Sequence, residues 1–160
     1  MLCFEPLENG NILISTEPGD RLVEIDRLGS ILREVSLPAP STAAPRIGLL
    51  ENGNLLLPEQ SEGLLRELDG QTGEVVWEYR LPHEERTERP SSLAAARLSS
   101  GNTLIASEGE VLLREITPQG ELVWTLEQTE LPQLKLSNIV ALQVLPGGSC
   151  AIEQRLAPAG

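Results

Sequence analysis

ELDGQTGEVVWEY (residues 67–79) and EITPQGELVWTL (residues 115–126) are two copies of one phrase in a chain of 160 residues. Each copy passes from an acidic residue through a polar turn with a glycine to a tryptophan, Trp77 or Trp124. The chain holds 2 Trp in all, so both stand at the same place in a repeat. Periods of about 20 to 50 residues are typical of repeat architectures, and the repeat is therefore the guide to the fold.

A second motif, Leu-x-x-Gly, divides the chain in the same way. It occurs as LENG, LENG, LSSG and LPGG, and its glycines lie 43, 48 and 47 residues apart, at Gly10, Gly53, Gly101 and Gly148. Each is flanked by short apolar runs that predict strands. The Asn-Gly pairs at positions 9–10 and 52–53 predict two-residue hairpin turns, which need a positive φ at both central residues. We expect four antiparallel strands in each repeat.

Four such strands in a period of this length are the unit of a β-propeller blade. We therefore predict an all-β, β-propeller-like fold with three complete blades and a partial fourth. It would form a single domain over residues 1–160, with blades at about 1–38, 44–82 and 91–130 and a half-blade at 136–156. A helical repeat is the alternative, but glycine and proline interrupt every window long enough for a helix except the one around LAAARL.

Composition argues against several classes of partner. With 24 acidic residues against 12 Lys and Arg, the net charge of -12 repels nucleic acid and anionic membranes. No apolar run approaches the length of about 18 residues that spans a bilayer, and the amino terminus does not resemble a secretory signal. We expect a soluble chain, cytoplasmic unless it is a trimmed periplasmic form. Cys3 and Cys150 are interpreted as small apolar fillers on strands.

The tryptophans are expected to join neighbouring blades. Trp77 follows Gly73 by four residues and Trp124 follows Gly120 by four, so both lie at one site on the fourth strand of a blade. A large ring there would cover the seam to the next blade and bury about 200 Å². The first blade has Arg33 at this position, whose stem would lie along the seam.

These residues resemble a known family. LDGQTGEVVW is similar to the tryptophan-docking phrase of β-propeller repeats of the pyrroloquinoline-quinone type, and LENGNLLL resembles repeats of arylsulfotransferase-like propellers. The residues that match the docking phrase are Asp69, Thr72, Gly73 and Trp77, which the resemblance implies are structural. The same repeats occur in quinoprotein dehydrogenases, in sulfotransferases and in scaffold lipoproteins, so the resemblance implies a fold rather than one activity.

The inventory of reactive groups favours binding over catalysis. His83 is the single histidine and lies in the charged stretch HEERTERP, where a solvated side chain is the ordinary interpretation. The four aromatic residues are few for stacking on a quinone. We therefore predict no catalytic, cofactor-binding or metal-binding residues. The alternative is one part of a quinoprotein-like or arylsulfotransferase-like enzyme that is inactive without further blades.

Three and a half blades do not close a ring of the family's kind. We expect either a protein partner or self-assembly of several copies, a homo-oligomer, into a larger ring. The insertion between the second and third blades is the candidate partner loop, and its residues are His83, Glu84, Glu85, Arg86, Glu88 and Arg89. The recurring carboxylates Glu24, Glu67 and Glu115 are interpreted as surface charge rather than a cation site, and SEGE at 107–110 as a turn.

Overall fold

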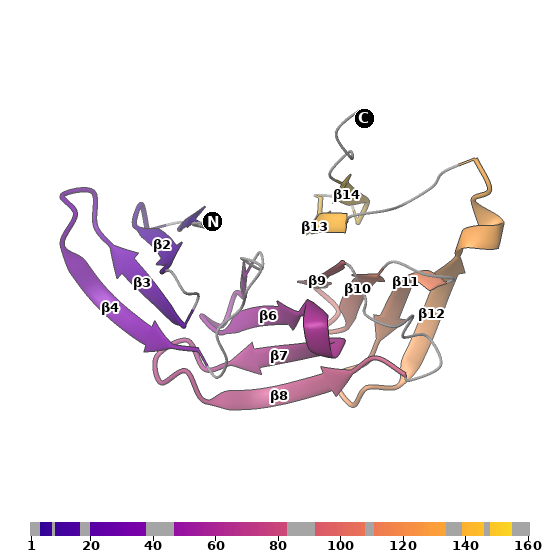
Figure 1. The fold of residues 1–160 in the computed structure, drawn as a ribbon, viewed down its shortest axis with the longest axis horizontal. Helices are drawn as coiled ribbons and strands as arrows, with labels where there is room; N and C mark the ends of the chain where they lie inside the picture. Colours follow the sequence, from indigo (N-terminus) through magenta and orange to yellow (C-terminus); the bar gives the residue numbers. More distant parts are fainter. Residues whose placement is uncertain are drawn as a thin grey trace. The chain divides into compact units, whose positions relative to one another are not determined.

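The structure is a computed structural model, and it describes residues 4–7, 9–16, 20–37, 47–82, 92–107, 111–133, 139–145 and 148–154 (Figure 1). Its strands form three four-stranded antiparallel sheets and one two-stranded sheet. Short 3₁₀ helices occur at Gln60–Glu62 and Gln128–Glu130. The predicted all-β, propeller-like fold with three complete blades and a partial fourth is confirmed.

Each sheet is built from strands that follow one another in the sequence. The first consists of β1 (Phe4–Pro6), β2 (Ile12–Ser15), β3 (Arg21–Ile25) and β4 (Ile31–Ser36). The second consists of β5 (Gly48–Leu49), β6 (Leu55–Glu59), β7 (Leu64–Leu68) and β8 (Val75–Arg80). The third consists of β9 (Leu93–Arg97), β10 (Thr103–Ser107), β11 (Val111–Ile116) and β12 (Leu122–Glu127). The segment LAAAR is therefore a strand, not a helix.

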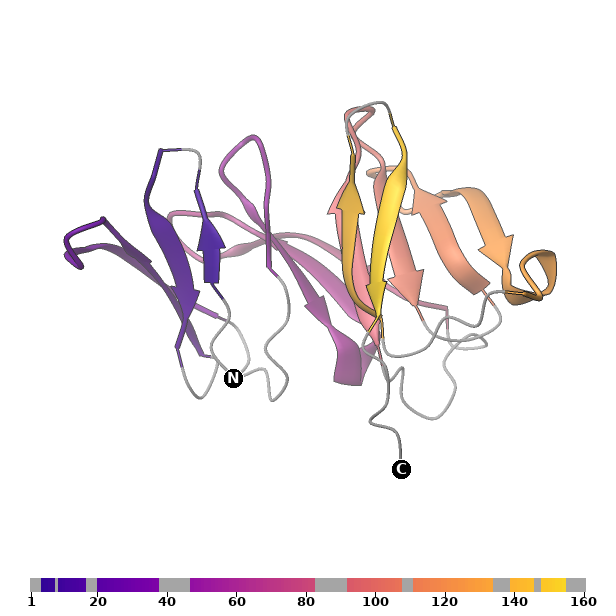
Figure 2. The same ribbon diagram turned by 90° about the horizontal axis from the view of Figure 1, so that it is seen from above.

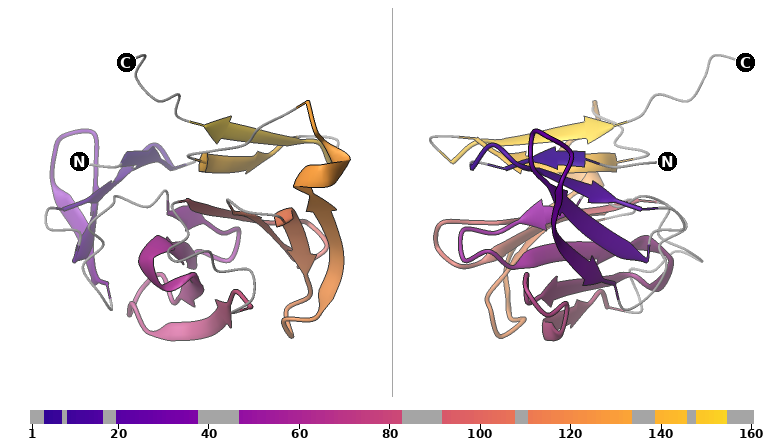
Figure 3. Two further views of the ribbon diagram at one scale, coloured as in Figure 1. Left: turned by 45° about the vertical axis from the view of Figure 1, so that its right-hand side comes forward. Right: turned by 90° about the vertical axis from the view of Figure 1, so that its left-hand side faces the viewer.

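The partial fourth blade is the hairpin of β13 (Ile139–Val144) and β14 (Cys150–Gln154), drawn in yellow in Figure 2. Among the described residues no strand pairs with the other edge of β14 (Figure 3). Strand β13 packs beside β9. The hairpin thus supplies the first two strands of a blade and leaves the places of the third and fourth strands open within the described part of the chain.

The hairpin turns at the Leu-x-x-Gly motifs have three-residue loops, so the predicted two-residue turns are wrong. The amide of Leu50 donates to the carbonyl of Asn54 at 2.8 Å, and the amide of Gly53 donates to the carbonyl of Leu50 at 2.8 Å. Gly53 has φ 85° and ends the loop in the left-handed conformation. A turn of this kind followed by a left-handed glycine is a common three-residue hairpin loop, and it explains why leucine stands three residues before the glycine.

The chain divides into two compact units, which are Met1–Leu57 with Glu67–Trp77, and Pro58–Arg66 with Glu78–Gly160. The core of the first unit is aliphatic. Its buried members come from strands of the first two sheets and from the residue directly before β5, and they are Leu13, Leu22, Val35, Ile47, Leu55, Leu57 and Leu68. These side chains point inward because strands alternate apolar and polar residues.

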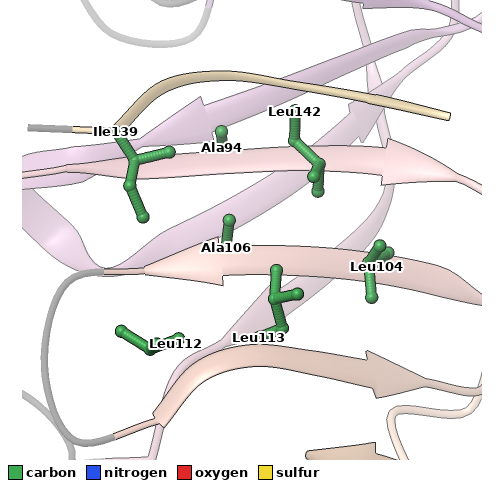
Figure 4. Packing of buried hydrophobic residues seen from close by; sticks show 7 residues of the cluster. All are labelled: Ala94, Leu104, Ala106, Leu112, Leu113, Ile139 and Leu142. Carbon is green, nitrogen blue, oxygen red and sulfur yellow. The ribbon is translucent and has the colours of Figure 1, made fainter. Parts of the chain in front are cut away.

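The core of the second unit joins the third sheet to the partial blade. Figure 4 shows Ala94 of β9 between Ile139 and Leu142 of β13, with Ala106 of β10 below them. The small alanines leave room for the larger side chains of β13, so the layers interdigitate. The partial blade is therefore packed into the second unit's core through its inner strand.

Candidate interaction surface

Gly73, in the turn between β7 and β8, packs against β4, the outer strand of the first sheet. It has φ 76°, and a β-carbon at this position would lie 2.7 Å from the carbonyl oxygen of Ser36 and 2.9 Å from Cγ1 of Val35. Both distances are shorter than packed side chains allow. Only glycine lets the turn come this close to β4.

Arg33 of β4 reaches the same turn. Its Nη1 donates a hydrogen bond to the carbonyl oxygen of Gly70, and its Nη2 lies 3.1 Å from Oε2 of Glu24. A β-carbon at Gly70 would overlap the carbonyl oxygen of Gly53, so this residue too must be glycine. The contact that the structure shows is polar and is made by the guanidinium of Arg33, whereas the apolar cover by its stem stays a prediction.

The docking phrase shapes this turn from within. One carboxylate oxygen of Asp69 accepts hydrogen bonds from the backbone amides of Thr72 at 2.8 Å and Gln71 at 2.9 Å. The hydroxyl of Thr72 accepts one from the amide of Glu74 at 3.2 Å. The bond from the Thr72 amide, followed by that from Gln71, lowers the pKa of Asp69 below its ordinary value of 3.8, since both favour the ionised carboxylate.

A second contact of the same kind lies in the second unit. Gly120, with φ 83°, is in the turn between β11 and β12, and a β-carbon there would lie 3.4 Å from Cδ2 of Tyr79 on β8. Tyr79 follows Gly73 by six residues, as Val35 follows Gly29 by six. In both contacts, therefore, the turn glycine of one repeat meets the residue six places after the corresponding glycine of the preceding repeat.

The two tryptophans differ in exposure. Trp77 on β8 is half-buried, whereas Trp124 on β12 is 45% exposed. Trp124 is therefore not buried in a seam, as was expected. Among the described residues no turn packs on Trp124, whereas the Gly70 turn packs on Arg33, its counterpart in the first sheet. Leu122, two residues before Trp124 on β12, is 60% exposed.

Exposed apolar side chains recur at the beginning of each outer strand. They occupy the second and third positions after the turn glycine, and they are Ile31, Leu32, Val75, Val76, Leu122 and Val123. With Trp124 they account for seven of the ten exposed large apolar side chains among the described residues. Clustered exposed apolar residues are typical of protein interaction sites, whereas scattered ones are not.

The recurring carboxylates are hydrogen-bonded, and the interpretation as surface charge is wrong for Glu67, which is buried, whereas Glu24 and Glu115 are partly exposed. The side-chain amide of the asparagine directly before the neighbouring strand donates to each at 2.7 Å; the pairs are Asn11–Glu24, Asn54–Glu67 and Asn102–Glu115. Glu67 is only 8% exposed. The hydrogen bond from Asn11, the largest influence, lowers the pKa of Glu24 below its ordinary value of 4.5. The asparagine directly after each of three hairpin glycines was the sequence signal for these pairs.

Other predicted features meet different outcomes. The candidate partner loop, with His83, Glu84, Glu85, Arg86, Glu88 and Arg89, lies outside the described residues, as do Cys3 and most of SEGE. Cys150 begins β14 with an exposed thiol, so its interpretation as an apolar filler is wrong.

In the parts of the chain that the structure covers, no group of three or more His, Cys, Asp or Glu side chains is placed to hold a metal ion. Nor does that part contain a helix with the length and apolar character required to cross a bilayer.

The fold and the repeated docking contacts define a protein built from propeller repeats. Residues 3–147 match the family model described as "Outer membrane protein assembly factor BamB", and the chain belongs to this family. No curated protein sequence matches it significantly. The match to this family confirms the resemblance of LDGQTGEVVW to repeats of the pyrroloquinoline-quinone type. The arylsulfotransferase-like resemblance stays a hypothesis.

Solved structures show the same fold. A Bacteroides caccae protein of unknown function has a TM-score of 0.69 at 18% identity, over 94% of this chain and 56% of that one. An inactive virginiamycin B lyase from Staphylococcus aureus, solved with quinupristin, gives 0.54 at 16%, over 94% and 54%. BamB from Moraxella catarrhalis gives 0.50 at 22%, over 78% and 35%. The chain therefore spans between about a third and somewhat over half of these proteins.

Proposed function

We propose that this chain is a non-catalytic propeller-repeat module that binds a protein partner through the outer strands of its sheets. The observation that carries the proposal is the recurrence of exposed apolar pairs at the start of β4, β8 and β12. An apolar pair in each repeat offers a partner several equivalent contacts. Outer strands also carry unpaired backbone groups to which an extended segment can add.

The family supports the same direction. BamB is described as an assembly factor of outer membrane proteins, and such a task is carried out by contacts between proteins. The acidic balance of the chain, with a net charge of -12, favours a partner surface that is apolar at its centre and basic at its rim. The enzyme alternative, quinoprotein-like or arylsulfotransferase-like, has no specific contact of the described residues in its favour.

Site-specific photocrosslinking in cells tests the proposal. A photoreactive amino acid is placed at Val76 or Val123, which are 55% and 52% exposed, and in matched variants at the exposed Glu74 or Glu121, each two residues earlier. We expect one discrete protein adduct from the apolar positions and far less from the acidic ones. Equal yields from all four positions, or no adduct at any, would contradict the proposal.

A further inference from the structure

Asn52 and Gly53 lie exposed in the hairpin loop between β5 and β6, and they form an Asn-Gly pair. In such a pair the backbone nitrogen of the glycine can attack Cγ of the asparagine, because glycine has no β-carbon to hinder the approach. The attack closes a succinimide ring and is the first step of asparagine deamidation. Asn9 and Gly10 form a second pair of this kind in the described part of the chain.

The contacts of Asn52 bear on this reaction in both directions. Its Oδ1 accepts a hydrogen bond from the backbone amide of Asn54 at 3.0 Å, which makes Cγ more electrophilic. A β-carbon at Gly53 would meet nothing within 4 Å, so no packed side chain opposes a rearrangement of the loop. The amide of Gly53 donates to the carbonyl of Leu50 at 2.8 Å and must leave it before its nitrogen can attack. The reaction should therefore be slower in the native loop than in an unfolded chain, yet not blocked by packing.

The loop touches two groups that a change at Asn52 would disturb. The first is the carboxylate of Glu67, which is 8% exposed and accepts a hydrogen bond from Nδ2 of Asn52 at 3.4 Å. The second is the Gly70 turn, since a β-carbon at Gly70 would overlap the carbonyl oxygen of Gly53. The carbonyl oxygen of Gly70 in turn accepts the hydrogen bond from Arg33 of β4. Asn52 thus adjoins the contact between the first two sheets.

We propose that Asn52 is a site of spontaneous deamidation and that the product weakens this contact between the sheets. The nitrogen of Gly53 bonds to Cγ and gives up its proton, while the Cγ–Nδ2 bond breaks and the amide leaves with that proton as ammonia. Water then adds to one of the two carbonyl carbons of the ring and opens it to aspartate or isoaspartate. Aspartate has a carboxylate where the amide donated to Glu67, and two carboxylates in contact repel each other. Isoaspartate lengthens the main chain by one methylene beside the Gly70 turn.

Peptide mapping by mass spectrometry tests the chemical step on the full, unaltered chain. After storage in mildly alkaline buffer, Asn52 should be converted several-fold faster than Asn54, whose next residue is Leu55. Aspartate and isoaspartate have equal mass and separate by chromatography, and both should appear. Conversion at Asn52 that is no faster than at Asn54 would overturn the proposal. Neither result bears on a partner at the outer strands, which the photocrosslinks test separately.

The effect on the contact between the sheets is tested with Asn52→Asp and a neutral counterpart, Asn52→Ser. Serine stands at this place in the third repeat, where Oγ of Ser100 accepts a hydrogen bond from the amide of Asn102 at 3.3 Å, so the loop tolerates it. Asn52→Asp should give the lower urea midpoint of the two, and Glu67→Gln should reduce the difference because it removes the opposing charge. Equal midpoints for Asn52→Asp and Asn52→Ser would overturn the proposed weakening.

Asn9→Asp is the matched control, because it adds the same charge to the same loop of the first repeat. Its neighbour Glu24, to which Nδ2 of Asn9 donates at 3.4 Å, is partly exposed. Nη2 of Arg33 lies 3.1 Å from the Glu24 carboxylate and offsets part of the repulsion. The urea midpoint should therefore fall less for Asn9→Asp than for Asn52→Asp. A fall at Asn9 that equals or exceeds the fall at Asn52 would contradict the role given to Glu67 and the Gly70 turn.

Discussion

Gly73 and Val35 are packed so closely that a β-carbon on Gly73 would stand 2.9 Å from Cγ1 of Val35. The same relationship recurs between Gly120 and Tyr79 at 3.4 Å. A turn glycine resting on an outer strand is thus the repeated joint of this protein. Its consequences can be measured by changing the glycine, the strand residue or the turn.

Gly73→Ala should destabilise the protein more than Gly53→Ala. Both glycines have positive φ, 76° and 85°, which costs alanine about 1–2 kcal/mol in either place. Only Gly73 also has close neighbours, since a β-carbon at Gly53 would meet nothing within 4 Å. We expect an additional loss of about 1–3 kcal/mol for Gly73→Ala in urea unfolding, typical of overpacking. Equal losses for the two variants would show that the joint is loose.

Trp124→Ala should reduce the free energy of unfolding by less than Trp77→Ala does. Trp124 is 45% exposed, so its removal should cost under about 2 kcal/mol, below the range of about 3–5 kcal/mol for a fully packed tryptophan. The half-buried Trp77 should cost more. Chemical denaturation at low protein concentration provides the comparison, and a larger loss at Trp124 than at Trp77 would contradict the exposure of its ring.

Asn54→Ala should reduce stability by about 1–3 kcal/mol, because it leaves the buried carboxylate of Glu67 without the amide that donates to it at 2.7 Å. The control is Glu51→Ala in the same loop, at an exposed position, where the change should be within about 0.5 kcal/mol. Urea midpoints decide the matter. If the two variants unfold alike, the Asn–Glu pair contributes nothing.

The protein should lose stability in acid in steps set by its hydrogen-bonded carboxylates. The pKa of Glu24 is lowered in the folded state from its ordinary value of 4.5, and the pKa of Asp69 from 3.8. Groups of this kind stabilise the fold above the unfolded pKa, and their contribution disappears as the pH falls through the folded pKa. Stability should therefore decline below about pH 4.5. Asp69→Asn should flatten that decline, and an unchanged slope would show that the Asp69 turn is not linked to folding.

Much of the fold was predictable because the same turn residues recur in each repeat. The glycines after LEN, LSS and LPG mark hairpins whose position does not depend on tertiary contacts, and the apolar runs between them mark the strands. The loop length at Gly53 was wrong because Asn-Gly also fits a three-residue loop, and only the hydrogen bonds of Leu50 decide between them. Local chemistry determined the elements but not the type of turn.

The contacts between repeats were only partly predictable. Trp124 and Trp77 occupy the same place in the repeat, yet their exposure differs because it depends on what lies beyond each outer strand. The hydrogen bond from Asn54 to Glu67 joins the residue before β6 to β7, so predicting it required the register of these two strands as well as the repeat pattern. Neither the depth of a side chain nor the identity of its partner is contained in a single repeat.

A double-mutant cycle between Gly73 and Val35 tests the repeated joint most directly. Gly73→Ala places a β-carbon 2.9 Å from Cγ1 of Val35, and Val35→Ala removes that atom. Two residues that are packed against each other show interaction energies of about 0.5–3 kcal/mol in such a cycle. We predict that Gly73→Ala costs less stability in the Val35→Ala background than in the unaltered protein, as measured by urea unfolding. Equal costs in the two backgrounds would contradict the claim that these repeats join through a turn glycine packed on an outer strand.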